Sequence, residues 1–123
     1  MHMIVSDIRE RAAFEVERFN PVLLNQTQRS KTMLVCLEPG QAIPVHRPGS
    51  DLTLTLLEGR ATLVCEDEEL TDAGPGATLV AEAHQRRGIR ADERTLALVT
   101  VSPPPTEADH QEVFAHLQRG TWR

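Results

Sequence analysis

Several short segments of the chain alternate apolar and polar residues, and this period of two predicts β-strands. The clearest is 51–57, in which Leu52, Leu54 and Leu56 fall on one face and threonines fall on the other. Pro21 is expected to break the chain before the first strand, which leaves a short N-terminal segment outside the sheets. Apolar runs bounded by turn residues or charges predict further strands at 31–38, 61–65, 77–81 and 94–102.

The end of the chain carries the clearest helical signal. Pro103–Pro105 stop the last strand, because proline cannot donate a hydrogen bond to a sheet. Thr106 and Asp109 then resemble a capping box, which predicts a helix over about 107–119 that Gly120 ends. Many short strands followed by one helix predict an all-β barrel or sandwich.

Length and composition limit the classes of function. The 123 residues suffice for one domain, and we expect a single domain over 1–123. A net charge of −5 argues against a nucleic-acid surface. No apolar run approaches the roughly 18 residues of a membrane span, and the chain opens without a secretory signal, so we expect a cytoplasmic protein with no membrane partner. Cys36 and Cys65 are expected to be reduced core residues, and the acidic run 66–69 a solvated hairpin tip.

Glycines at fixed distances around one histidine add a second kind of signal. Gly40 precedes His46 by five intervening residues, Gly59 ends the same segment, and Gly76 opens another. The spacing of these residues resembles that of the two signature motifs of the cupin family, over roughly residues 30–102. The resemblance implies a jelly-roll β-barrel with a short N-terminal segment and a C-terminal helix.

The same motifs usually carry three histidines and one glutamate, which together bind a first-row divalent metal. At the corresponding positions this chain has His46, Pro48, Leu52 and Arg87. Proline and leucine offer no donor atom, and an arginine stays protonated and repels a cation. The resemblance therefore implies a barrel that has lost three of its four metal ligands, and we favour no metal cofactor.

A rearranged metal site is the alternative. His46, Glu82 and His84 are the candidate ligands of a divalent first-row metal, because Glu82 and His84 would share a face if their segment were extended. Asp51 is a weaker candidate, because it precedes Leu52 in the same strand and its side chain should point away from the interior. A site of this kind would make the protein a metal-dependent cupin enzyme, of the oxygenase or isomerase type.

Arg87 is the most informative departure from the motifs. If the correspondence holds, its guanidinium points into the barrel, where a charge without a partner is costly. It would then need either an ion pair with Glu82 or Asp51, or a carboxylate or phosphate ligand. We favour a metal-free module that binds a small anionic molecule, with candidate ligand-binding residues His46, Arg87, His84 and Leu52.

Two further readings stay open. His46 could act as acid or base in a metal-free isomerase, because a histidine pKa near 6.5 suits proton transfer. It is the one candidate catalytic residue, although no carboxylate partner is evident in the sequence and the chain has no tyrosine. Alternatively, side chains fill the barrel and the protein acts through its surface. Cupins are commonly dimeric, so the resemblance also implies a homodimer.

Overall fold

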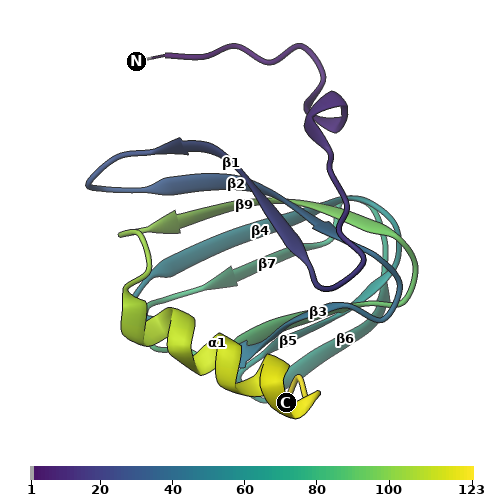
Figure 1. Cartoon of the computed structure of the whole chain (residues 1–123), viewed down its shortest axis with the longest axis vertical. Helices are drawn as coiled ribbons and strands as arrows, with labels where there is room; N and C mark the ends of the chain where they lie inside the picture. Colours follow the sequence, from purple (N-terminus) through teal and green to yellow (C-terminus); the bar gives the residue numbers. More distant parts are fainter. Residues whose placement is uncertain (1) are drawn as a thin grey trace.

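The computed structural model describes residues 2–123 as two antiparallel β-sheets and one C-terminal helix, which confirms the predicted fold class (Figure 1). One sheet has the strand order β1-β2-β9-β4-β7, with bounds Asn20–Gln26, Lys31–Leu37, Thr95–Ser102, Asp51–Glu58 and Thr78–Ala81. The other has the order β3-β8-β5-β6, with bounds Ala42–His46, Arg87–Ala91, Ala61–Cys65 and Glu68–Ala73. A short 3₁₀ helix, η1 (Ile8–Arg11), precedes them, and α1 (Glu107–Arg119) follows.

The main core lies between the inner faces of the two sheets. On β4, Leu52, Leu54 and Leu56 are buried and Thr53 is exposed, as the alternation predicted. The same period places alternate residues of β9 and β8 in the interior, because successive side chains of a strand point to opposite faces. The inward positions of both sheets thus form one cluster.

Four strands lie where no strand was predicted: β1, β3, β6 and β8. Pro21 was expected to break the chain, but it is the second residue of β1. This strand is at the edge of its sheet, where a residue without a backbone N–H is tolerated. The acidic run was expected to be only a hairpin tip, but Glu68 already belongs to β6 and the turn takes only Glu66 and Asp67. In β8, Gly88 interrupts the apolar pattern because a Cβ there would come within 2.7 Å of Val45 Cγ2.

One of the glycines that match the cupin motifs is required for a steric reason. Gly59 has a φ of 95°, and a Cβ on it would lie 2.3 Å from the carbonyl oxygen of Arg94. Both the positive φ and the close approach exclude a side chain. The turn after β4 can therefore pass next to the start of β9.

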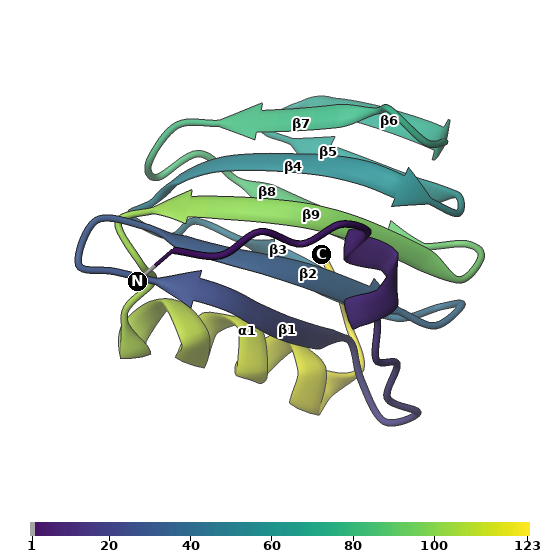
Figure 2. The ribbon, with the colours of Figure 1, turned by 90° about the horizontal axis from the view of Figure 1, so that it is seen from above.

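The N-terminal segment covers the outer face of the five-stranded sheet (Figure 2). Leu34, Cys36 and Leu96 point to this side and form a second buried cluster. The partly buried residues of the segment and of the outer sheet face that cover it are Ile8, Ala12, Phe14, Val22 and Leu57. Cys36 is buried and Cys65 half-buried, and both thiols are free.

The helix α1 closes the open side of the barrel. It begins with the predicted capping box, in which Asp109 N–H donates to Thr106 Oγ1 and Thr106 N–H donates to the Asp109 carboxylate. It ends at Gly120. The helix contacts β3, and Figures 1 and 2 show it along the seam between β1, the edge of one sheet, and β3, the edge of the other.

Candidate functional site

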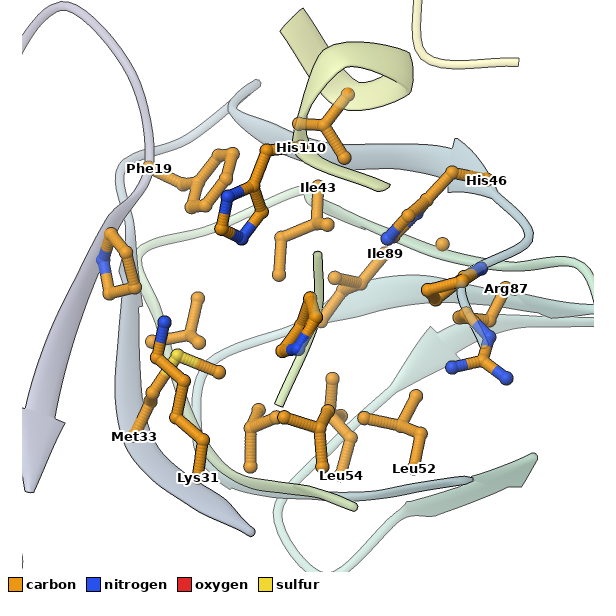
Figure 3. Close-up of a pocket in the computed structure, with 18 of the residues that line it drawn as sticks. Phe19, Lys31, Met33, Ile43, His46, Leu52, Leu54, Arg87, Ile89 and His110 are labelled. Atoms are coloured by element: carbon orange, nitrogen blue, oxygen red, sulfur yellow. The ribbon is translucent and has the colours of Figure 1, made fainter. Parts of the chain in front are cut away.

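The space between the sheets is not completely filled. A pocket of about 260 Å³ remains next to α1 (Figure 3). His46 and Arg87 both line it, because they are directly opposite partners in the antiparallel pair β3–β8. Residues of both sheets, of α1, of the segment before β1 and of two loops complete the wall: Arg18, Phe19, Pro21, Lys31, Met33, Val35, Ile43, Pro48, Leu52, Leu54, Leu79, Gly88, Ile89, Val99, Val101, Pro105, His110, Val113 and Phe114.

Arg87 is a buried cation held by backbone oxygens. Only 3% of its surface is exposed. Its Nε donates to the carbonyl of Gln85 at 2.8 Å and its Nη2 donates to the carbonyl of Glu82 at 2.7 Å. Within residues 2–123 no carboxylate lies within 4.0 Å of the guanidinium, so the ion pair considered with Glu82 or Asp51 does not form. The charge is oriented but not neutralised.

Burial lowers the pKa of Arg87 from its usual value, while the thiol of Cys65 and the carboxyl of Asp51 raise it. A guanidinium stays protonated in proteins even so. Two of its N–H groups are engaged by carbonyls, and the others, including those on Nη1, are available to an acceptor. A carboxylate or phosphate oxygen in the pocket would supply both the acceptor and the missing negative charge.

His46 contributes a neutral ring beside this cation. Its Nδ1 lies 2.8 Å from the carbonyl oxygen of Pro44, and since a carbonyl only accepts, Nδ1 carries the hydrogen. Burial is the main cause that lowers the pKa of His46, and the charge of Arg87 lowers it further. In the neutral ring, Nε2 is therefore an acceptor. The pocket presents a donor and an acceptor next to one another.

Three further basic side chains line the pocket, and sequence analysis did not single them out. They are Arg18, Lys31 and His110. Lys31 lies on the same face of β2 as Met33 and Val35, which point into the barrel. A charged residue in such an inward-facing row could have indicated from the sequence that Lys31 lines the pocket. His110 faces the pocket from α1, where the sequence indicates only a helix surface. No carboxylate from residues 2–123 lines the pocket.

The other predicted site residues divide into two groups. Leu52 lines the pocket as part of its apolar wall, and Pro48 lines it too. Glu82 and His84 are outside the pocket lining, and Glu82 is exposed. His84 has a φ of 69°, which takes its segment out of the extended conformation that would have placed both side chains on one face. A role of Leu52 or His84 in ligand binding stays a prediction.

The side chains present do not fit the metal that the motifs usually hold. Of the four corresponding positions only His46 has a donor suited to a metal, and Arg87 puts a positive charge where another ligand would stand. The rearranged set is not assembled either: among residues 2–123 no group of three or more His, Cys, Asp or Glu side chains is placed to hold an ion.

Comparison with solved structures identifies the family. The TT1209 protein of Thermus thermophilus is 32% identical, with a TM-score of 0.75, over 82% of this chain and 98% of that one. An RmlC-like cupin protein from Desulfovibrio desulfuricans is 30% identical, with a TM-score of 0.72, over 84% of this chain and 99% of that one. The chain is a cupin. KdgF from Halomonas sp. shares the cupin fold at 21% identity and a TM-score of 0.69, over 78% and 89% of the two chains.

No family model matches the sequence, and no curated protein matches it either. The cupin resemblance and the jelly-roll class are thus confirmed by solved structures. Among residues 2–123 no helix is long and apolar enough to cross a bilayer. The homodimer and the cytoplasmic location stay predictions.

Proposed function

We propose that this cupin is a metal-free module that binds a small organic anion with an apolar body. The observation that carries the proposal is the composition of the pocket wall. Its charged residues, Arg18, Lys31 and Arg87, are all cationic, and the rest of the wall is mostly aliphatic or aromatic. An aliphatic carboxylate matches both properties.

The energetics favour such a ligand at Arg87. A buried guanidinium bound only to neutral carbonyls has already lost most of its hydration, so an incoming carboxylate meets a desolvated, oriented donor. Hydrogen bonds to charged groups contribute about 1.5–3 kcal/mol each. The pocket volume of about 260 Å³ corresponds to roughly nine water molecules at ~30 Å³ each, which suits a ligand of about ten non-hydrogen atoms.

The test is calorimetric titration with octanoate, using octanamide as the uncharged analogue. Octanoate is expected to bind, and octanamide to bind about 10–100-fold more weakly, the affinity ratio that the charge-assisted bonds correspond to. Arg87→Gln is expected to remove the preference for the anion. Arg87→Lys keeps the charge without the two-nitrogen fork, and it should retain part of the preference.

Arg90→Gln is the matched control, because Arg90 is an exposed arginine of the same strand whose side chain lies outside this pocket. It should bind octanoate like the wild type. Thermal unfolding of each variant establishes that it is folded. An Arg87→Gln protein that is folded and still prefers octanoate would contradict the proposal. So would one tightly held first-row metal per chain, measured by elemental analysis, whose removal abolishes binding.

A further inference from the structure

The pocket has positive groups at two separate places. His46 and Arg87 lie on one side, whereas Lys31, Met33 and Phe19 lie on the opposite side (Figure 3). Lys31 is the only lysine of the chain. Apolar side chains separate the two sides, among them Leu54 and Ile89. A ligand that meets only Arg87 would leave Lys31 without a counter-charge.

The second side has features of a charged subsite. Lys31 is half-buried at the start of β2, and within residues 2–123 it forms no ion pair. Arg18 lies nearby in the wall, with its guanidinium carbon 5.8 Å from the centre of the Phe19 ring and 5.2 Å from that of Phe114. Such stacking holds a guanidinium over an aromatic face while its N–H groups stay available. His110 adds a ring nitrogen from α1.

Electrostatics link the two sides. Like charges around one apolar cavity repel each other, and water screens them less there than at an open surface. No carboxylate of residues 2–123 lines the pocket, so the protein compensates this charge only through carboxyls outside the wall, such as Asp51 and Asp109. A ligand with one anionic group would compensate one side only.

We infer that the ligand of this pocket carries two acidic groups joined by an apolar spacer, as an α,ω-dicarboxylate does. One carboxylate binds Arg87 beside His46, the spacer lies against the aliphatic wall, and the second carboxylate binds Lys31. Arg18 and His110 are within the same wall and add donors to the second group. This inference rests on the proposed function and names the class of anion.

The experiment compares diacids with monoacids that have the same number of carbons. Calorimetric titrations use the series from succinate to sebacate, and octanoate as the partner of suberate. The best diacid is expected to bind about tenfold more tightly than its monoacid, the ratio that one additional charge-assisted contact of ~1.4 kcal/mol produces. Affinity should pass through a maximum along the series, because only one spacer length reaches both sides.

Variants assign each carboxylate to its side. Lys31→Met keeps the aliphatic stem and should lower the ratio of diacid to monoacid affinity about tenfold, so that suberate loses its advantage over octanoate. Lys31→Arg should keep the preference for the diacid. If Lys31→Met does not fold, Lys31→Gln replaces it. Arg87→Gln should weaken both ligand types.

The outcomes separate the two proposals. Equal affinities for diacid and monoacid, or a diacid preference that survives Lys31→Met, would overturn the inference and leave the anion-binding module intact, provided that Arg87→Gln weakens both. Failure of every acid in the series to bind, or insensitivity of binding to Arg87→Gln, would instead overturn the proposed function itself.

Discussion

The two ends of the barrel interior are formed by the same strands but differ in how they are filled. On β4, Leu54 lines the pocket, whereas Leu56, two residues further along the same face, is 1% exposed and lies outside the pocket lining. On β9, Val99 lines the pocket and Ala97 does not. Inward residues at the filled end include Leu37, Leu56, Ala61, Ala73, Ala91 and Ala97.

Side-chain size explains the difference. At the filled end, one sheet contributes Leu37, Leu56 and Ala97 and the other contributes the three alanines Ala61, Ala73 and Ala91. All six are buried in one cluster, so the small side chains of one sheet leave room for the leucines of the other and the space is occupied. At the pocket end, the wall carries leucine, isoleucine and valine side chains from both sheets together with the basic groups, and α1 closes the side where the sheets separate. One pattern of alternation thus produces a packed core and a binding cavity in one barrel.

The largest expected effect separates the two ends by truncation. Leu56→Ala should lower the free energy of unfolding by about 3–5 kcal/mol, because it opens a cavity in a filled region. Leu54→Ala should cost about 2 kcal/mol, since this side chain already borders open space and loses fewer contacts. Urea unfolding, with the slope compared between variants, measures both. Equal losses would mean that the pocket is closed in solution.

The converse change adds atoms. Ala97→Val should cost about 1–3 kcal/mol, because Ala97 is 0% exposed and the added methyl groups have no space. Val99→Ile should cost under about 1 kcal/mol, because its extra methyl enters the pocket. The same variant should weaken octanoate binding, which calorimetry detects, whereas Ala97→Val should leave it unaltered in protein that remains folded.

The sequence predicted which residues of a strand face the interior. It did not predict whether these side chains fill the space between the two sheets or leave a cavity there. Leu52, Leu54 and Leu56 form one continuous row in the sequence, and nothing in that row marks where filling ends and the cavity begins. The answer depends on the facing sheet, whose strands β3 and β8 were not predicted. Pro44 in the first, and two arginines and a glycine in the second, obscure the alternation.

The candidate site was predicted in part. The pairing of His46 with Arg87 across β3 and β8 follows the motif correspondence, because both positions are inward ligand positions in the family pattern. Arg18 and His110 could not be placed, since no local pattern shows that the N-terminal segment and α1 meet at the same cavity. Glu82 and His84 were candidate metal ligands on the assumption of an extended segment, which the positive φ of His84 excludes.

The smallest expected effect is on the pH dependence of stability. It again distinguishes the two ends of the barrel, because His46 lies at the pocket end. Burial and the charge of Arg87 on β8 lower the folded-state pKa of His46, against the opposing effects of the Pro44 carbonyl and of Glu112 and Asp109 on α1. In the unfolded chain the pKa returns to about 6.5. Below about pH 6.5, His46 therefore binds a proton in the unfolded state but stays neutral in the folded state.

Stability should therefore be highest above about pH 6.5 and should fall as the pH drops toward the lowered folded-state pKa, by at most ~1.4 kcal/mol per pH unit. Urea unfolding of the wild type and His46→Gln between about pH 5 and 7.5 tests this, above the range in which carboxyl groups such as Asp109 titrate. His46→Gln should flatten the slope. Leu56→Ala should lower the whole curve and keep the slope, because it removes packing at the end without a titrating group. A wild-type slope no steeper than that of His46→Gln would show that the imidazole is not desolvated, and the pocket end would then be as open to water as the outer surface of the barrel.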